Sequence, residues 1–296
     1  MLIRGLIRLV FCCVLMPGSA QAAPVLVDST WLEAHHKDNN VVIVDMTDDD
    51  LQYTRFHLPG AVRLAYHELL QPRRPGKPVA RLDDAQFAAL LGRLGIAHDS
   101  HVVIYDDMGG LNAGRLFLEL ERIRHPEVSV LDGGLVTWAL SGKPVDNIPH
   151  LRKPATYQSG TERRSNLATL ADVRRVSGQG ASVLLDVRSR EEYTGNPKEA
   201  RSGHIPGARW WPWEQSINMG NGFVFQEEDK LEASLDRFGL TDRHAPVILY
   251  CHSGHRATQS YLTLRRLGFD DVRVHSGSML EYLIDKAAPL TRGLVP

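Results

Sequence analysis

The amino-acid sequence predicts an α/β protein with two doubly wound parallel sheets in tandem, each covered by helices on both faces. Short β-branched runs alternate with amphipathic stretches of helical length. The runs are apolar at nearly every position, as in strands that are buried on both faces of a sheet. The pattern occurs twice along 296 residues, a length that suits two domains, each with its own core.

The two copies are recognised by segments that match step for step at a separation of about 145 residues. For example, VVIVDM answers SVLLDV, and FHLPGA answers GHIPGA. The matching pairs are, in chain order, 41–46 with 182–187, 56–64 with 203–211, 85–107 with 229–251 and 128–134 with 272–278. One fold is therefore expected twice.

The first copy shows the expected order of elements most clearly. Strands and helices alternate, so that each strand can return parallel to the one before it. The expected strands are VVIV (41–44), HVVIY (101–105) and VSVL (128–131), and the expected helices are LDDAQFAALLGRLGI (82–96) and AGRLFLELERI (113–123).

Residues 1–22 have the anatomy of a secretory signal peptide. Arg4 and Arg8 precede a short apolar stretch, and small residues end at Ala22. The apolar stretch is too short to span a bilayer, so an uncleaved anchor is the less favoured alternative. We expect cleavage after Ala22, a periplasmic or secreted mature chain, and no association with the membrane after cleavage.

The mature chain is expected to divide into two domains and a linker. The first domain covers 23–150, and the second covers 169–296. Residues 151–168 lack periodicity and are rich in polar residues and breakers, which is typical of a linker. The 34 basic and 35 acidic residues almost cancel, so no net field attracts nucleic acid or an anionic membrane.

Loss of the signal peptide would leave Cys251 as the only cysteine, because Cys12 and Cys13 lie within it. A lone cysteine cannot form an intramolecular disulfide. A structural cysteine in the core is one interpretation, since free cysteine is often buried. The neighbours of Cys251 favour a reactive thiol instead.

Cys251 directly follows the apolar run VILY and precedes a stretch with helical periodicity. In open α/β sheets, ligands bind beyond the carboxyl ends of the strands, at helix N-termini. We expect a six-residue loop here, from Cys251 to Arg256. The matching position in the first copy is Asp106, which has no thiol, so that copy is expected to act as a scaffold.

The loop CHSGHR is suited to an anionic sulfur. Gly254 permits a turn that aims successive N–H groups inward at the positive end of the helix dipole. A free thiol has a pKa of about 8.5, and helix N-termini and nearby cations lower it. Arg256 is always charged, and His252 and His255 are expected to be charged part of the time. The sequence therefore predicts a thiolate.

These motifs carry a family resemblance. The chain resembles the tandem-domain rhodanese superfamily, the thiosulfate and 3-mercaptopyruvate sulfurtransferases, over nearly all of its mature length. The stretches that carry it are VVIVDM, VLLDVRSREEY, FHLPGA, GHIPGA, VSVLDGGLVTW, CHSGHRA and GSMLEY. As in that family, the first copy looks catalytically silent.

The resemblance implies that Cys251 takes sulfur from a small-molecule donor, becomes a persulfide and passes the sulfur to cyanide, to a thiol or to a protein acceptor. No metal or organic cofactor is implied. By the same resemblance, Arg201 lies where family members often bind substrate. The residues expected to contact substrate are His252, Ser253, Gly254, His255, Arg256 and Arg201.

The donor is open between two compounds. Ser253 at the third loop position resembles mercaptopyruvate enzymes, in which a histidine of the HIPGA motif and an upstream acid support that serine. His57 matches the histidine, although a structural role in its turn is the favoured interpretation. The imidazole pair and the guanidinium of Arg256 favour a compact dianion, so thiosulfate is the expected donor.

Other interpretations of the loop are weaker. A cysteine-dependent phosphatase has five residues between cysteine and arginine, whereas four separate Cys251 from Arg256. Structural zinc sites need a second cluster of ligands, and a disulfide oxidoreductase needs a second cysteine nearby. A non-enzymatic persulfide carrier or docking module would require the same Cys251, so the sequence leaves that alternative open.

Overall fold

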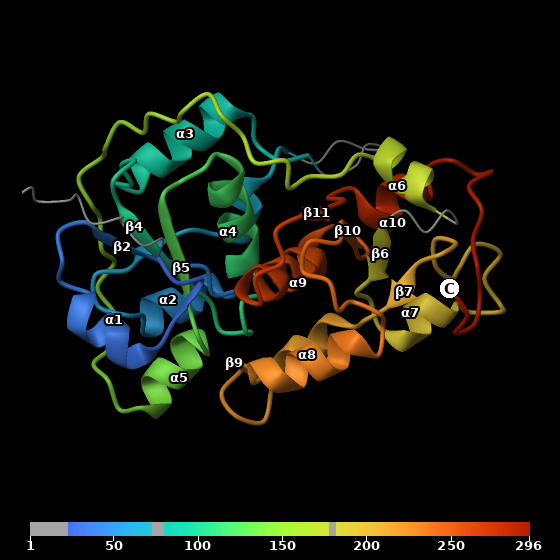
Figure 1. Ribbon diagram of the computed structural model, residues 1–296. Coiled ribbons are helices and arrows are strands. Elements are labelled where there is room, and N and C mark those ends of the chain that lie inside the picture. Colours follow the sequence, from blue (N-terminus) through green and yellow to red (C-terminus); the bar gives the residue numbers. More distant parts are fainter. Residues whose placement is uncertain (1–22, 73–79, 178–181) are drawn as a thin grey trace, which may run out of the picture.

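The computed structural model describes residues 23–72, 80–177 and 182–296 and shows two α/β domains side by side (Figure 1). The first domain holds a parallel sheet whose strand order is β1-β5-β4-β2-β3. Its strands are β1 (Leu26–Val27), β2 (Val41–Asp45), β3 (Val62–Arg63), β4 (His101–Tyr105) and β5 (Glu127–Leu131). Its helices are α1 (Ser29–His35), α2 (Asp50–Arg55), η1 (Tyr66–Leu69), α3 (Asp84–Arg93), α4 (Ala113–Arg122) and α5 (Gly134–Leu140).

Alternate residues of the first sheet face different helices, because successive side chains of a strand point to opposite faces. Val42 and Val44 pack in the cluster that contains the apolar side chains of α3 and α4. Val41 and Ile43 pack in a second cluster with side chains of α1 and α5. The first sheet therefore has helices on both faces, as predicted (Figure 1).

The second domain repeats this plan with a parallel sheet of order β11-β10-β6-β7. Its strands are β6 (Val183–Asp186), β7 (Arg209–Trp210), β10 (Val247–Tyr250) and β11 (Val272–Val274), and a separate antiparallel hairpin is formed by β8 (Ile217–Asn218) and β9 (Val224–Phe225). Its helices are α6 (Leu170–Val176), α7 (Arg190–Thr194), η2 (Trp213–Ser216), α8 (Glu228–Asp236), α9 (His255–Arg266) and α10 (Ser278–Tyr282).

The repeat extends to one histidine turn in each domain. His57 donates through Nδ1 to the carbonyl oxygen of Tyr53 at 2.6 Å and stacks on its ring at 3.9 Å. His204 makes the same contacts with Tyr193, at 2.8 Å and 3.8 Å. Both histidines are buried. These contacts fit the structural interpretation of His57, which holds its turn within the first domain.

The two domains meet through α4 and α9, which lie against each other between the sheets (Figure 1). One apolar cluster includes side chains of both domains, so the core continues across this interface. At its centre Gly114 approaches the main chain of Thr258 so closely that a Cβ atom on Gly114 would lie 2.7 Å from the carbonyl oxygen. Glu121 accepts hydrogen bonds from Tyr261 and Arg265 across the same interface.

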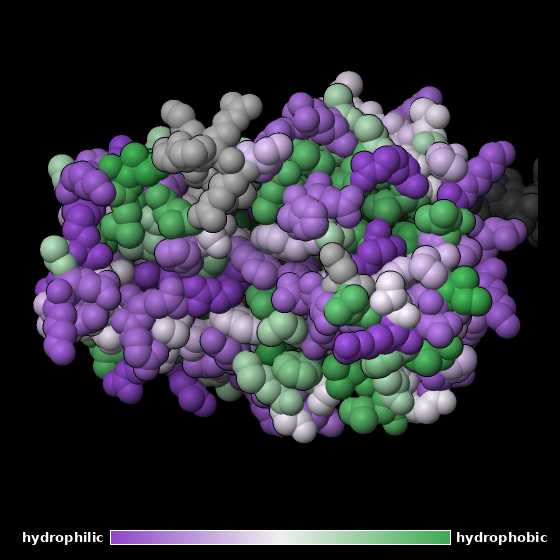
Figure 2. Space-filling view, turned by 180° about the vertical axis from the view of Figure 1, so that it is seen from behind, coloured by the Kyte–Doolittle hydropathy of each residue, from purple (hydrophilic) through white to green (hydrophobic). Residues whose placement is uncertain are grey.

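The expected signal peptide, residues 1–22, lies outside the described residues. In the described part of the chain, no helix has the length and apolar character needed to cross a bilayer. Residues 151–168 contain no helix or strand. Ala155 donates its N–H to the carbonyl oxygen of Gly92 in the first domain, and the end of the segment, at Leu167, pairs with Val274 of β11 in the second. Figure 2 shows hydrophilic and hydrophobic residues interspersed over the rear face of the molecule.

The substitution Gly114→Ala is expected to destabilise the protein by about 1–2 kcal/mol. Alanine is favoured over glycine in a helix by about 1 kcal/mol. Overpacking, however, costs about 1–3 kcal/mol. The cost is high here because the new Cβ atom would meet main chain of the facing helix, which cannot move aside as a side chain could. Urea unfolding measures the change. Gly160→Ala is the control, because nothing lies within 4 Å of a Cβ there. An equal or smaller loss for Gly114→Ala would contradict the prediction.

Candidate functional site

Cys251 begins the loop that follows β10, at the carboxyl edge of the second sheet. Its side chain is buried, with 1% of the residue exposed. The N–H of Gly254 donates to Cys251 Sγ at 3.1 Å. Gly254 adopts a left-handed conformation with φ of 88°, and a Cβ atom there would lie 2.4 Å from the carbonyl oxygen of Ser276. Only glycine can therefore form this turn around the sulfur.

The loop is shorter than the sequence predicted. Left-handed Gly254 is the N-cap of α9, and the helix begins at the next residue, His255. His255 and Arg256 thus belong to the first helical turn and are not loop residues. The first N–H groups of a helix have no partner within it and form the positive end of its dipole. Cys251 lies beside this positive end.

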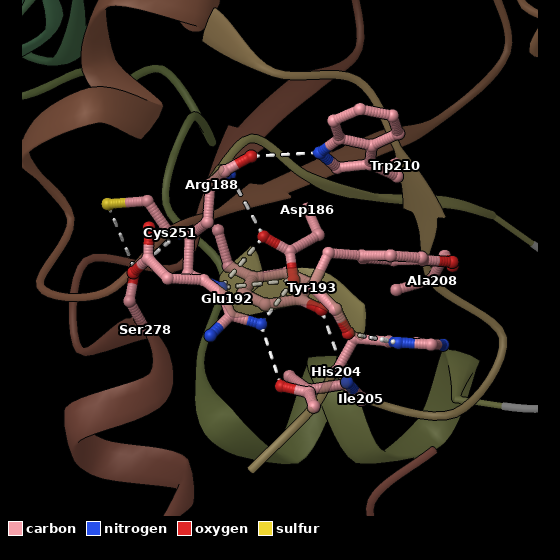
Figure 3. A network of polar contacts seen from close by, with 12 residues as sticks. Asp186, Arg188, Glu192, Tyr193, His204, Ile205, Ala208, Trp210, Cys251 and Ser278 are labelled. Carbon is pink, nitrogen blue, oxygen red and sulfur yellow. Dashed lines mark hydrogen bonds and ion pairs between the residues drawn. The ribbon is translucent and has the colours of Figure 1, made fainter. Parts of the chain in front are cut away.

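Ser278, which the sequence analysis did not single out, fixes the main chain of Cys251 (Figure 3). The N–H of Cys251 donates to Ser278 Oγ at 3.0 Å, and Ser278 Oγ donates in turn to the carbonyl oxygen of His275 at 2.8 Å. Ser278 Oγ lies 4.0 Å from Cys251 Sγ. Ser278 therefore orients the residue that carries the sulfur, and its hydroxyl also lies within reach of the sulfur itself. The GSMLEY motif, which contains Ser278, was the sequence signal that could have identified this residue.

Arg256 is held in a two-point ion pair with Glu192 of α7. Its guanidinium donates to the two carboxylate oxygens at 2.6 and 2.9 Å. Burial acts to raise the pKa of Glu192, but the paired Arg256 lowers it to about 2. The charge of Arg256 is therefore balanced. Glu192 belongs to the REEY stretch of the repeat, and sequence reasoning missed it because the pairing joins distant segments.

His255 points toward the first domain. Its Nε2 lies 2.7 Å from Asn112 Oδ1, and its ring centre lies 4.3 Å from that of Tyr66. Asn112 Nδ2 donates to the carbonyl oxygen of Met46, so Oδ1 is the accepting atom and Nε2 carries the proton. Burial lowers the pKa of His255 to about 4. The expectation that His255 carries charge near neutral pH is therefore wrong.

Asp106 occupies in the first domain the place that Cys251 occupies in the second, directly after the central strand β4. Its buried carboxylate accepts hydrogen bonds from the N–H groups of Met108, Gly110, Asn112 and Ala113, at 2.8 to 3.0 Å. Burial raises the pKa of the Asp106 carboxyl, and the four N–H groups act to lower it. The loop of the first copy is thus a ring of amides around a carboxylate that the chain itself supplies.

Two cavities border the Cys251 loop, and the exposed His252 lines both. The first, of about 410 Å³, also contains Arg201 at its edge. The guanidinium of Arg201 donates to the carbonyl oxygens of residues 285, 286 and 288, at 3.2, 2.6 and 3.0 Å, so it is occupied in holding that turn. The second cavity, of about 630 Å³, brings Ser253 opposite His67 of the first domain.

The described residues include no group of three or more histidine, cysteine, aspartate and glutamate side chains that could hold a metal ion. The structure thus brings His252, Ser253, Gly254, His255 and Arg256 together near Cys251, and Arg201 lines one of the neighbouring cavities. Within that group, only Gly254 makes a hydrogen bond to the sulfur in the described part of the chain.

Comparison with known proteins gives relatives that cover both domains. A protein of Thermus thermophilus named sulfur carrier protein TtuD is 30% identical over 285 residues, which cover 91% of this chain and 97% of the relative. A protein of Mycobacterium tuberculosis, provisionally named a thiosulfate sulfurtransferase, is 32% identical over 282 residues, or 91% of this chain and 98% of the relative.

Among solved structures, SseA from Escherichia coli, described with the 3-mercaptopyruvate sulfotransferases, superposes with a TM-score of 0.74. It is 25% identical, and the match covers 86% of this chain and 99% of SseA. The family model of the rhodanese-like domain matches this chain twice, over residues 28–141 and 169–285. The chain therefore belongs to the rhodanese family of sulfurtransferases and carries two copies of its domain in tandem.

Proposed function

We propose that this chain is a sulfurtransferase in which Cys251 takes the outer sulfur of thiosulfate and passes it to cyanide or to a thiol. The observation that carries the proposal is the bond from Gly254 N–H to Cys251 Sγ at a helix N-terminus. The equivalent loop of the first domain binds a carboxylate with four amides, so this kind of loop holds an anion. Burial alone would also fit a structural cysteine, but an N–H group directed at the sulfur can stabilise negative charge that forms there during transfer.

The proposed reaction has two steps. The thiolate of Cys251 attacks the outer sulfur of thiosulfate, a sulfur–sulfur bond forms, and the bond to the sulfonate group breaks. Sulfite leaves with the electron pair, and Cys251 becomes a persulfide anion. Cyanide then attacks the outer sulfur, thiocyanate leaves, and the thiolate is restored. Positively polarised N–H groups around the loop stabilise the negative charge on sulfur in both steps.

The donor is proposed as thiosulfate on the strength of the M. tuberculosis relative, whose provisional name cites that substrate. Local charge supports it less than the sequence indicated, because Glu192 balances Arg256 and His255 is neutral. A specific observation favours 3-mercaptopyruvate as the second candidate. Ser253 borders a cavity of about 630 Å³, lined by polar and apolar side chains, which has room for an organic acid.

A sulfur carrier that delivers to another protein is a further candidate, and the name of the T. thermophilus relative favours it. It differs from the enzyme only in its acceptor, so acceptor turnover distinguishes them. We also propose, from the motif in residues 1–22, that transfer takes place in the periplasm or outside the cell.

Thiosulfate treatment is expected to add one sulfur, about 32 Da, to the peptide that contains Cys251, and Cys251→Ser should abolish both this addition and thiocyanate formation. Mass spectrometry and a thiocyanate assay measure the two steps, with 3-mercaptopyruvate compared in parallel. A persulfide that never passes to cyanide or to small thiols would support the carrier. A wild-type protein that gains sulfur from neither donor would contradict the proposal.

Glu192→Gln is expected to lower the KM for thiosulfate about threefold to tenfold, because it frees the charge of Arg256 and one added charge changes binding by about 1 kcal/mol. The KM for 3-mercaptopyruvate, a monoanion, should fall less. Glu199→Gln is the matched control. It removes a carboxylate from the same cavity, where Glu199 pairs with Asn196 and not with Arg256. Equal changes in both variants would refute a specific role for the pair.

A further inference from the structure

Tyr66 is unusual among the tyrosines of this chain. Seven of the eight tyrosine hydroxyls take part in a hydrogen bond; these are Tyr53, Tyr105, Tyr157, Tyr193, Tyr250, Tyr261 and Tyr282. Within the described residues, the hydroxyl of Tyr66 has no hydrogen-bond partner. Buried or half-buried tyrosines usually find one. An unpaired hydroxyl at a domain interface is available to a ligand.

Tyr66 belongs to the first domain, yet it lies against the Cys251 loop. It begins η1, and its ring is 4.3 Å from the ring of His255, the first residue of α9. Its neighbour His67 and the loop residues His252 and Ser253 line the same cavity of about 630 Å³. The short helix η1 is thus the part of the first domain that faces the loop.

The Tyr66 hydroxyl is protonated at neutral pH. Burial raises the pKa of Tyr66 to about 12, and a negative charge on Cys251 contributes to the rise. The hydroxyl therefore keeps its proton throughout the neutral range and can donate it. His255 holds the ring from one side and is itself fixed by Asn112.

A persulfide at Cys251 adds a second sulfur atom, which needs hydrogen-bond donors besides those that contact Sγ. The outer sulfur stands about 2 Å beyond Sγ. The contacts of Gly254 N–H and Ser278 Oγ, at 3.1 and 4.0 Å, are made to Sγ itself. Stabilising the outer sulfur anion needs further hydrogen-bond donors.

We propose that the hydroxyl of Tyr66 donates a hydrogen bond to the transferred sulfur at Cys251, so that the first domain supplies a substrate-contacting residue to the site of the second. This inference rests on the proposed function. The contact exists only when the extra sulfur is present, on bound thiosulfate or on the persulfide. Tyr66 therefore acts on sulfur transfer and not on the free thiolate.

The variant Tyr66→Phe tests this directly, because it removes the hydroxyl and keeps the ring against His255. The rate of persulfide formation from thiosulfate, followed by mass spectrometry in a single turnover, is expected to fall about 10- to 100-fold, the effect of losing one donor to a charged group. Alkylation of Cys251 by iodoacetamide, which senses the free thiolate alone, should stay within about twofold.

Tyr157→Phe is the matched control, since its hydroxyl bonds His125, on the first domain away from the loop. It should leave both rates unchanged. Unaltered persulfide formation in Tyr66→Phe would overturn the inference, and so would a parallel fall in alkylation, which would show that Tyr66 only supports the loop. Failure of the proposed function is distinguishable, because it appears in the wild-type protein as the absence of any persulfide.

Discussion

The site depends on one constraint, the left-handed turn at Gly254 that ends β10 and starts α9 within four residues. The turn directs an N–H group to Cys251 Sγ and brings the sulfur beside the positive end of α9. The same glycine packs on the main chain of Ser276, and Ser278 fixes the N–H of Cys251. The parallel sheet thus positions Cys251, and the turn at Gly254 directs a positively polarised N–H group toward its sulfur.

Both domains contain this strand-to-helix loop, but a different side chain accepts the hydrogen bonds of its N–H groups in each. In the first domain Asp106 accepts four N–H groups and permanently occupies its own ring of amides. In the second domain the matching residue is Cys251, whose Sγ accepts the N–H of Gly254. The N–H of Asn112 is one of the four donors to Asp106, and the side chain of Asn112 contacts His255 of the second domain. The first domain thus helps to shape the surroundings of Cys251.

The sequence predicted the tandem fold and the place of Cys251 because both depend on local pattern, namely apolar runs, helical periodicity and a repeated order of motifs. It could not predict the charge state of His255 or the pairing of Arg256. Both arise from residues far away in the chain, Asn112 and Glu192, and from burial that only the folded protein defines. The loop length was overestimated, because a left-handed glycine starts the helix earlier than the pattern of apolar residues indicates.

The contact of Gly114 with Thr258 bears on how the protein evolved. Here the main chains of two helices are in direct contact, so no side chain lies between them that could adjust to mutations in either helix. Once a duplicated gene had reached this packing, deletion of the copy without a thiol would have exposed the apolar core that both copies share. Selection on folding alone is therefore sufficient to retain both halves.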